Sequence, residues 1–471
     1  MARFPLLFLS SLALAHAGPI AFNVPFKVPD GAAELDPAPV AISYEFFAFP
    51  SYFLNVSNTQ PCVRNLQDLT GVPPRIRIGG TTQDRAVYDP SLAAYVNYSV
   101  ANYTVAPSNL TYGASFMELA GTYPGSVVIG LNRGHDNLTN TIAAAKVAVD
   151  SIDTLYALEL GNEPDLYLRD GQAIATSLGT WTPELDAASE ASWQVAVGEA
   201  VNRTAIIQAG NFVSDPPTWS AAELIANENA SALPYIKDWS HHNYHQGGSN
   251  ANLQRLMNHS DIAANIAEYV ADVAVARGTG KEYVIGETNS VSGGGAAAVS
   301  PTFGGALWVL DFSLRAASIG VKRIYYHFGT VGNCAYCWWG RGSVASPYAG
   351  AYAATYALSH GSRIVSLDAS NASLPMRAVL YNSAYYDGNG TRSQQEFVLH
   401  GLRAHAVLVR RLTADSAVAR QDRGGNPSFA GRAFANATCG LLGREVVERV
   451  RVKKGKASVV VGASEAVVVD L

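Results

Sequence analysis

The chain has 471 residues, a formal net charge of -5 at pH 7 and a pI near 6.1. Only 15% of its residues are charged, so it lacks the dense basic face that phosphate-backbone binding requires, and a nucleic-acid partner is not expected. The length suits one large and one smaller domain, because an α/β barrel often takes about 250 residues as a single domain.

The first 17 residues have the pattern of a secretory signal peptide: a basic Arg3, an apolar run over 4–14 and the small-residue ending Ala15-His16-Ala17. No later apolar stretch reaches the roughly 18 to 20 residues that cross a bilayer, so no membrane contact is expected. Asn-x-Ser/Thr sequons, which mark N-glycosylation sites, begin at Asn55, Asn97, Asn102, Asn109, Asn137, Asn202, Asn229, Asn258, Asn371, Asn389 and Asn436. A secreted, N-glycosylated protein is predicted.

Four cysteines are too few for a disulfide scaffold but enough for one or two bridges in an oxidising compartment. Cys334-Ala-Tyr-Cys337 has the spacing of a redox motif or of half a zinc site. The second such pair that zinc requires is missing, so a structural disulfide is favoured there. The sequence does not fix how Cys62 and Cys439 pair.

Short β-rich runs alternate with alanine-rich helical segments between residues 37 and 362. Eight such runs predict a (β/α)8 TIM barrel, an α/β fold, and a doubly wound sheet is disfavoured because no glycine-rich phosphate turn follows the first run. The expected helices include 141–152, 193–203, 261–276 and 305–320. The expected strands are 40–46, 75–78, 127–131, 155–160, 205–209, 236–242, 283–285 and 323–328.

Beyond the barrel, residues 363–471 lose helical spacing and predict a small antiparallel β-sandwich domain. The N-terminal segment 18–36 is expected to add an edge strand to this sandwich. Basic residues alternate over 449–456, which is typical of the solvated face of a strand and less often of a polyanion-binding surface. The expected sandwich strands are 377–381, 396–399, 406–412, 458–461 and 466–469.

Polar side chains gather where the barrel strands end, which is where barrel enzymes place their active sites. The fourth run ends in Gly161-Asn162-Glu163-Pro164 and the seventh in Gly286-Glu287, so two carboxylates are expected to face each other across the barrel mouth. Glu45 ends the first run and His327 the eighth. Retaining glycoside hydrolysis uses two carboxyl groups about 5 Å apart, with one held protonated and the other ionised.

Other interpretations of these residues are weaker. Glu163 could instead cap the helix that begins at Pro164. His241, His242 and His245 suggest a metal site, but the spacing of a zinc protease helix is absent, so no metal and no cofactor are expected. The chain also has no Gly-x-Ser-x-Gly nucleophile elbow.

Several segments together resemble glycoside hydrolase family 79, the β-glucuronidases and heparanase, within a clan of retaining (β/α)8 enzymes. They are Ile76-Arg-Ile-Gly-Gly-Thr81 with Asp84, Leu160-Gly-Asn-Glu-Pro164, Trp239-Ser-His-His-Asn-Tyr244 and Gly286-Glu-Thr-Asn289. The resemblance implies that Glu163 is the acid/base and Glu287 the nucleophile. It also implies that Asn162 binds the sugar 2-hydroxyl, that Tyr244 holds the nucleophile, and that Glu45, Gly80 and Thr81 contact the substrate.

In this family, donors in the loop after the nucleophile bind the uronate carboxylate, and Ser292, Gly293 and Gly294 match that loop. An aromatic residue that some relatives carry there is absent. Tyr336 is therefore a further candidate for substrate binding. Weaker candidates are Arg341 and the rings of Trp338 and Trp339, which could stack on a sugar.

The predicted function is a retaining β-glucuronidase that removes terminal glucuronic acid, with or without a 4-O-methyl group, from glycans or proteoglycans. Alternatives are an endo-acting heparanase-like hydrolase, which the low charge disfavours, another retaining β-glycosidase of the clan, and a non-catalytic sugar-binding glycoprotein. The sequence fixes neither the aglycone nor the oligomeric state.

Overall fold

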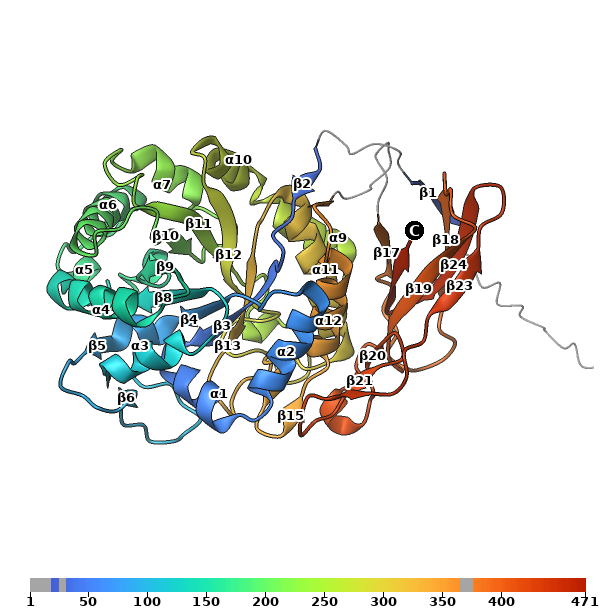
Figure 1. Ribbon diagram of the computed structural model, residues 1–471, viewed down its shortest axis with the longest axis horizontal. Helices are drawn as coiled ribbons and strands as arrows, with labels where there is room; N and C mark the ends of the chain where they lie inside the picture. The colour runs from blue at the N-terminus through green and yellow to red at the C-terminus, as the bar shows by residue number, and fades with distance from the viewer. Residues whose placement is uncertain (1–17, 25–30, 365–375) are drawn as a thin grey trace, which may run out of the picture.

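A computed structural model describes residues 18–24, 31–364 and 376–471 (Figure 1). The predicted signal peptide and the sequon at Asn371 lie outside these residues. A strand-and-helix barrel packs beside a strand-rich C-terminal part, as Figure 1 shows. Among the helices that the structure describes, none combines the length and the apolar character needed to span a bilayer.

Eight parallel strands close into a barrel in the order β3, β4, β8, β9, β10, β11, β12, β13 and back to β3. All eight predicted strands are confirmed, although the fifth begins and ends later than expected. The strands are almost entirely buried, because helices cover their outer faces and side chains fill the interior. Their bounds are β3 Val40–Glu45, β4 Ile76–Gly79, β8 Val127–Leu131, β9 Leu155–Leu160, β10 Ile207–Phe212, β11 Ile236–Asn243, β12 Glu282–Thr288 and β13 Ile324–Phe328.

The helices surround this barrel (Figure 1). The predicted helix over 261–276 is two helices, which separate at Glu268 and Tyr269, where the buried Tyr269 hydroxyl accepts a hydrogen bond from Asn243 Nδ2 at 2.8 Å. The helices are α1 Phe49–Asn55, α2 Thr59–Thr70, α3 Ala114–Gly121, α4 Leu138–Ser151, α5 Ala173–Thr176, α6 Pro183–Ala200, α7 Ala221–Asn227, α8 Leu253–Leu256, α9 His259–Ala267, α10 Val270–Gly278, α11 Phe303–Ile319 and α12 Pro347–Leu358.

A small sheet that the sequence did not predict interrupts the barrel between β4 and α3. It consists of β5 Ala86–Tyr88, β6 Val96–Asn97 and β7 Leu110–Tyr112, in the order β5, β7, β6. The long connection from β6 to β7 contains residues 104–106, which reach the mouth of the barrel.

Two sheets in the C-terminal part face each other across a shared apolar core that includes Leu399, Val407, Val459 and Val467. One sheet has the order β17, β25, β19, β20, with β23 pairing β19, and the other has the order β1, β18, β24. The predicted β-sandwich is confirmed. Its strands are β17 Arg377–Asn382, β18 Gln394–His400, β19 Ala406–Thr413, β20 Ser428–Phe429, β23 Glu448–Arg451, β24 Lys456–Gly462 and β25 Glu465–Asp470.

The N-terminal strand β1, Ile20–Asn23, runs parallel to β18 at the edge of the second sheet. The domain boundary near residue 363 stays a prediction, since residues 365–375 lie outside the described part. Short two-residue pairs complete the structure: β2 Ala33–Glu34 with β16 Arg363–Ile364, β14 Trp339–Gly340 with β15 Ser343–Val344, and β21 Ala433–Phe434 with β22 Leu441–Leu442.

Two disulfides use all four cysteines. The favoured Cys334–Cys337 bridge is confirmed, and it closes a tight loop after β13. The second bridge joins Cys62 of α2 to Cys439, 377 residues later, and so ties the barrel to the C-terminal part. In the chain-entropy model, a cross-link over so long a loop disfavours the unfolded chain strongly.

Candidate active site

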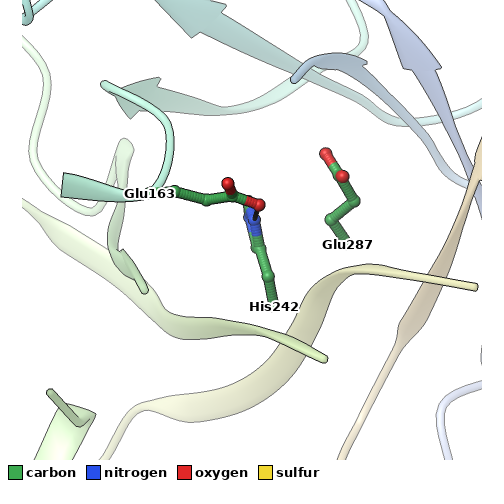
Figure 2. A group of neighbouring side chains, drawn as sticks. All are labelled: Glu163, His242 and Glu287. Atoms are coloured by element: carbon green, nitrogen blue, oxygen red, sulfur yellow. Dashed lines mark hydrogen bonds and ion pairs between the residues drawn. The ribbon is translucent and has the colours of Figure 1, made fainter. Parts of the chain in front are cut away.

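Glu163 and Glu287 meet at the C-terminal mouth of the barrel. Glu163 follows β9 and Glu287 lies near the end of β12. One oxygen of each carboxylate and a nitrogen of His242 all lie within 4.8 Å of one another, and Figure 2 shows the three side chains converging from separate elements. The separation of the two carboxyl groups is thus close to the roughly 5 to 5.5 Å of retaining glycosidases and shorter than the roughly 6.5 to 9.5 Å of inverting ones.

The turn that carries Glu163 has an unusual backbone. Glu163 adopts φ 50° and ψ 59°, a left-handed conformation that is uncommon for a residue with a side chain and is often found at functional sites. Gly161 precedes it at φ 85°, where a Cβ would lie 1.9 Å from Tyr167 Oη. The Glu163 side chain makes no capping hydrogen bond to the 3-10 turn Pro164–Leu166, so the helix-cap interpretation is wrong.

Glu163 is held in its protonated form. Burial, then the nearby Glu287 carboxylate, raise the pKa of Glu163 to about 8 although Arg77 opposes this. Glu163 Oε1 lies 3.2 Å from His242 Nδ1. Burial and the Arg77 charge lower the pKa of His242 to about 4, so its ring is neutral at pH 7 and shares a hydrogen bond with Glu163.

Glu287 is held ionised. Burial alone would raise its pKa, but His327, Arg77 and His242 together with the Tyr244 hydrogen bond lower the pKa of Glu287 to about 2. Arg77 NH1 donates to Glu287 Oε2 at 2.6 Å, and the Tyr244 hydroxyl donates to Oε1 at 2.7 Å. The two carboxyl groups therefore differ in proton affinity as acid and nucleophile must.

A buried guanidinium organises the floor of the site. Arg77 Nε and NH2 donate to the two oxygens of Glu159 at 2.7 and 2.5 Å. Arg77 NH1 also donates to Ser43 Oγ at 3.0 Å, and NH2 donates to Asn162 Oδ1 at 2.9 Å. The charge is fully buried, and these bonds compensate its desolvation. The role of Arg77 was not predicted from the sequence, although a cation inside a buried apolar strand indicates a charged partner.

His327, near the end of β13, connects Glu287 to Glu45. Its Nδ1 lies 2.9 Å from Ser43 Oγ and 3.4 Å from Glu287 Oε2, and its Nε2 lies 3.3 Å from Glu45 Oε2. Burial would lower the pKa of His327, but the Glu287 and Glu45 carboxylates raise it. This residue was noted at its strand end but not predicted to bind substrate.

The backbone at Gly80 leaves room for the Glu45 carboxylate to lie close to it. Glu45 Oε1 accepts hydrogen bonds from Thr82 N at 2.9 Å and Thr82 Oγ1 at 2.5 Å. Gly80 has φ 92°, and a Cβ there would lie 2.9 Å from Glu45 Oε2. Glycine is thus required at this position so that Glu45 can turn into the mouth of the barrel.

Asp84 clamps the turn after β9 to the turn after β4. Its carboxylate accepts hydrogen bonds from the backbone N–H groups of Arg133, Gly134 and Asn162 at 2.9, 2.9 and 2.7 Å, and from the Tyr167 hydroxyl at 2.8 Å. Glu163 follows Asn162 directly, so this clamp fixes the position of the Glu163 backbone.

A cavity of about 900 Å³ opens over the two carboxylates. Its wall contains most of the predicted site residues: Glu45, Thr81, Glu163, Tyr244, Glu287, Ser292, Gly293, Gly294 and Tyr336. The predicted site residues Gly80 and Asn162 are not among the residues that line the cavity. The remaining lining residues are Thr104, Val105, Ala106, Asp165, Leu166, Arg169, Val213, Ser214, Asp215, Thr218, Trp219, His327, Gly329, Thr330 and Asn333.

Three secondary candidates do not line this cavity. Trp338 and Trp339 are fully buried and pack against Phe328, so the prediction that they stack on a sugar is wrong. Their rings fill the core between β13 and α12 because the chain turns inward after Cys337. Arg341 is exposed and outside the cavity wall.

Tyr336 is positioned by the Cys334–Cys337 loop. Ala335 N donates to Gly294 O at 2.7 Å, which joins this loop to the glycine loop after β12. A Cβ on Gly295 would lie 2.8 Å from Tyr336 N, so the two loops pack backbone against backbone. The Tyr336 ring then lies 6.4 Å from the Tyr244 ring and 6.2 Å from the His327 ring, measured between centroids.

Glu163, His242 and Glu287 also have the atoms of a three-ligand metal site. The Arg77 guanidinium already occupies one side of Glu287 at 2.6 Å, and its charge opposes a second cation there. The donor set therefore fits proton transfer and nucleophilic attack better than it fits a metal ion.

Replacing Tyr244 by phenylalanine is expected to lower kcat/KM by about 10- to 100-fold, the range for losing one hydrogen bond to a charged group. The pKa of Glu287 should rise, because its ionised form loses a donor, and the acidic limb of the pH profile should move to higher pH. Tyr348→Phe is the matched control, since that buried hydroxyl donates to Cys62 O at 2.7 Å away from the cavity. An unshifted acidic limb in Tyr244→Phe would contradict the role.

Comparisons with known proteins find relatives among the glycoside hydrolases. Residues 369–468 match the family model described as the glycosyl hydrolase family 79 C-terminal beta domain. The chain is similar to a solved 4-O-alpha-L-rhamnosyl-beta-D-glucuronidase from Fusarium oxysporum in complex with Rha-GlcA. The identity is 45% and the TM-score 0.91, and the match covers 96% of this chain and 100% of that one.

Two curated fungal relatives are named beta-glucuronidase. The Aspergillus niger protein is 33% identical over 349 residues, which cover 65% of this chain and 61% of the relative. The Neurospora crassa protein is 30% identical over 335 residues, which cover 64% and 58%. The matched part thus spans about three fifths of each relative.

Proposed function

The chain belongs to glycoside hydrolase family 79, and from that premise we propose that it is a retaining β-glucuronidase that releases glucuronic acid from the non-reducing end of a glycan. The observation that carries the proposal is the carboxyl pair Glu163 and Glu287, within 4.8 Å and with opposed pKa shifts. The relatives named as glucuronidases support the substrate class.

In the first step, a Glu287 oxygen attacks the anomeric carbon while Glu163 gives its proton to the glycosidic oxygen. The bond to the aglycone breaks, the aglycone leaves as an alcohol, and an α-linked glycosyl-enzyme forms on Glu287. Tyr244 and Arg77 each donate to Glu287 before attack, so the nucleophile is oriented in advance.

In the second step, Glu163 is ionised and takes a proton from water, which attacks the same carbon from the face that the aglycone left. Two inversions give net retention. Once Glu287 is esterified its charge is gone, so the repulsion that raised the pKa of Glu163 disappears and Glu163 becomes a base.

The uronate carboxylate is proposed to lie against Ser292, Gly293, Gly294 and Tyr336, which line the cavity together. Gly293 and Gly294 have φ of 69° and 88°, a conformation that suits glycine, and the missing side chains let an anion approach the backbone N–H groups closely. Among the described residues, Arg169 is the one lysine or arginine in the cavity wall, and it lies on the segment after Glu163, so the donors proposed for the carboxylate are the hydroxyl and backbone N–H groups of the loop residues.

A second candidate is the release of a 4-O-substituted glucuronate. The Fusarium oxysporum neighbour is named for acting on 4-O-rhamnosyl glucuronate, and it shares 45% of its residues with this chain. The cavity of about 900 Å³ is also large for one sugar ring, because pockets of roughly 300 to 1,000 Å³ take whole drug-sized ligands. Product analysis on glycans with and without the 4-O-substituent separates the two candidates.

Secretion and N-glycosylation are part of the proposal. The signal-peptide pattern supports export, and nine of the eleven sequon asparagines are exposed, as glycan attachment requires. These nine are Asn55, Asn97, Asn102, Asn109, Asn137, Asn202, Asn229, Asn389 and Asn436. A mass shift on glycosidase treatment of the secreted protein tests this.

The activity is tested by comparing aryl β-glucuronide with aryl β-glucoside and by following the released anomer by NMR. We expect a preference for glucuronide of at least about 100-fold, since the donors aimed at the carboxylate are left unpaired by glucose. The first-formed product should be the β-anomer. Equal rates on both substrates would favour another glycosidase of the clan, and an α-anomer would overturn the double displacement.

A further inference from the structure

We propose that one end of the β-sandwich is a docking surface for carboxylated polysaccharides, separate from the catalytic cavity. The surface is formed by the hairpin between β23 and β24 and by the neighbouring turn between β18 and β19. The proposal adds a second carbohydrate site, and only its choice of carboxylated polymers rests on the proposed function. Five exposed cations of the hairpin, none of which lines the cavity, are named the basic end: Arg449, Arg451, Lys453, Lys454 and Lys456.

The C-terminal part of the chain is basic although the chain as a whole is acidic. Residues 376–471 contain 14 lysine and arginine residues and 8 aspartate and glutamate residues, while the formal net charge of the chain is -5. The excess of negative charge therefore lies before residue 376. Such an asymmetry attracts a polyanion to the C-terminal part of the protein and repels it from the rest.

The cations of the basic end are not neutralised by neighbouring acids. Elsewhere in the sandwich, Arg377 for example pairs with Asp470 at 2.9 Å. Within the part of the chain that the structure describes, no acid forms an ion pair with a residue of the basic end. Segments 397–407 and 449–459 contain no aspartate or glutamate. Five like charges thus gather without a counter-charge, and a bound polyanion would supply one.

The two turns that form the surface are joined to each other. Leu402 N donates to Gly455 O at 3.0 Å. Val452 N donates to His405 O at 2.9 Å. The turn between β18 and β19 adds Arg403 and His405 to the same end of the sandwich. The backbone hydrogen bonds hold these turns in place, so the surface needs little ordering when a polymer binds.

Lys454 occupies a position that the hairpin itself does not favour. Lys453 and Lys456 pair across a two-residue turn, in which Lys454 and Gly455 have φ of 51° and 73°. Turns of this kind prefer asparagine or glycine at the first of the two positions, because a longer side chain is crowded in the left-handed region. The geometry of the turn therefore does not explain this lysine, whereas a role for its charge does.

The basic end lies far from the cavity. Just past the end of β19, Ala417 O accepts a hydrogen bond from Gly304 N at 2.8 Å, at the start of α11. Helix α11 begins on the side of the barrel where β12 ends, so this end of the sandwich lies toward the mouth. Strand β19 begins at Ala406, opposite Arg451, and its eight residues span roughly 25 Å. Figure 1 shows β24 on the side of the sandwich away from the barrel. The surface therefore binds a different part of a polymer from the sugar in the cavity.

A polysaccharide fits this surface better than a membrane or a nucleic acid does. Peripheral membrane binding uses apolar side chains that insert between lipids, and single-stranded nucleic acids stack on aromatic side chains. Residues 400–406 and 449–456 expose no large apolar or aromatic side chain. The glucuronate-bearing glycans of the proposed function carry carboxylates, so we assign the surface to carboxylated polymers.

The test measures binding of the full-length protein to polygalacturonate, to dextran sulfate and to neutral dextran by calorimetry. Polygalacturonate contains no glucuronate, so binding to it does not report on the cavity. We expect polygalacturonate to bind, dextran not to bind, and the affinity to fall at least about tenfold between about 50 and 200 mM salt. The variant Lys453→Gln/Lys454→Asn/Lys456→Gln should lose at least about tenfold in affinity and keep kcat/KM on an aryl β-glucuronide within about twofold.

Arg64→Gln/Lys146→Gln/Arg423→Gln is the matched control, because it removes three exposed cations elsewhere. It should keep the affinity within about twofold, and an equal loss in both triple variants would overturn the surface. Binding to dextran sulfate or to phosphatidylserine vesicles, with none to polygalacturonate, would also overturn it. Lys454→Asn alone should weaken binding without lowering Tm, since asparagine suits the turn, and a lower Tm would contradict the role given to Lys454. A wild type that binds polygalacturonate but cleaves no aryl β-glucuronide would remove the proposed function and leave the docking surface.

Discussion

Replacing Glu287 by alanine is expected to lower kcat/KM by roughly 10⁵-fold on every glucuronide, whatever its leaving group. The size follows from the first step, because without this carboxylate no glycosyl-enzyme forms and leaving-group departure alone does not supply a nucleophile. A stopped assay on dinitrophenyl and methylumbelliferyl glucuronides measures the loss. Neither substrate should recover without an added nucleophile.

Added azide gives this experiment a distinctive product. In Glu287→Ala the space left by the carboxylate lies below the anomeric carbon, so azide attacks from that face and yields the α-glucuronyl azide by a single inversion. Glu282→Gln is the matched control, since Glu282 begins the same strand and pairs with the buried Arg323 at 2.6 Å, as Glu287 pairs with Arg77. It should keep a retaining reaction. Formation of the β-azide by Glu287→Ala would refute the assignment of the nucleophile.

The barrel could be predicted because its strands are buried on both faces. Such strands appear in the sequence as short apolar runs. Counting the runs assigned Glu163 to the fourth strand and Glu287 to the seventh, and the closed barrel places both at one mouth. Strand ends alone thus located the two acids without any knowledge of side-chain contacts.

The network beneath these acids was not predictable in the same way. Arg77 and Glu159 are 82 residues apart, and each looks anomalous in its own buried strand until the other is placed beside it. Local spacing says that both must be paired, but only the barrel register shows that Arg77 also reaches Glu287. The same limit applies to His327, whose role depends on Glu45 from a distant strand.

The outer wall of the cavity escaped prediction for a different reason. Residues 104–106 lie in a polar connection that contains sequons and no strand pattern, and such a segment is normally interpreted as a surface loop. For Trp338 and Trp339 the error was the reverse, because residues predicted to contact substrate lie in the core. Two adjacent aromatics at a strand end suggest a sugar platform, yet both rings turn into the core.

Replacing Glu163 by alanine should lower kcat/KM by an amount that depends on the leaving group of the substrate. For a disaccharide, whose leaving oxygen needs a proton, kcat/KM should fall by about 10³-fold, within the range for a general acid. For β-glucuronyl fluoride the first step should be nearly unaffected, since fluoride leaves without protonation. Azide should restore turnover and give the β-glucuronyl azide, because it attacks the glycosyl-enzyme on Glu287 from the face that the aglycone left.

The titration of Glu163 also predicts how kcat/KM depends on pH. The acid must be protonated, and its pKa is about 8, so kcat/KM on a disaccharide should fall as pH rises through that value. The nucleophile must be ionised, and its pKa is about 2, so the acidic limb should lie far below neutral pH. Glu163→Ala should lose the alkaline limb and keep the acidic one.

Glu228→Gln is the control, because burial also raises the pKa of Glu228, to about 9, yet Glu228 lies outside the cavity wall. If the alkaline limb survives in Glu163→Ala but vanishes in Glu228→Gln, that limb reports the titration of Glu228. Glu163 would then not be the acid.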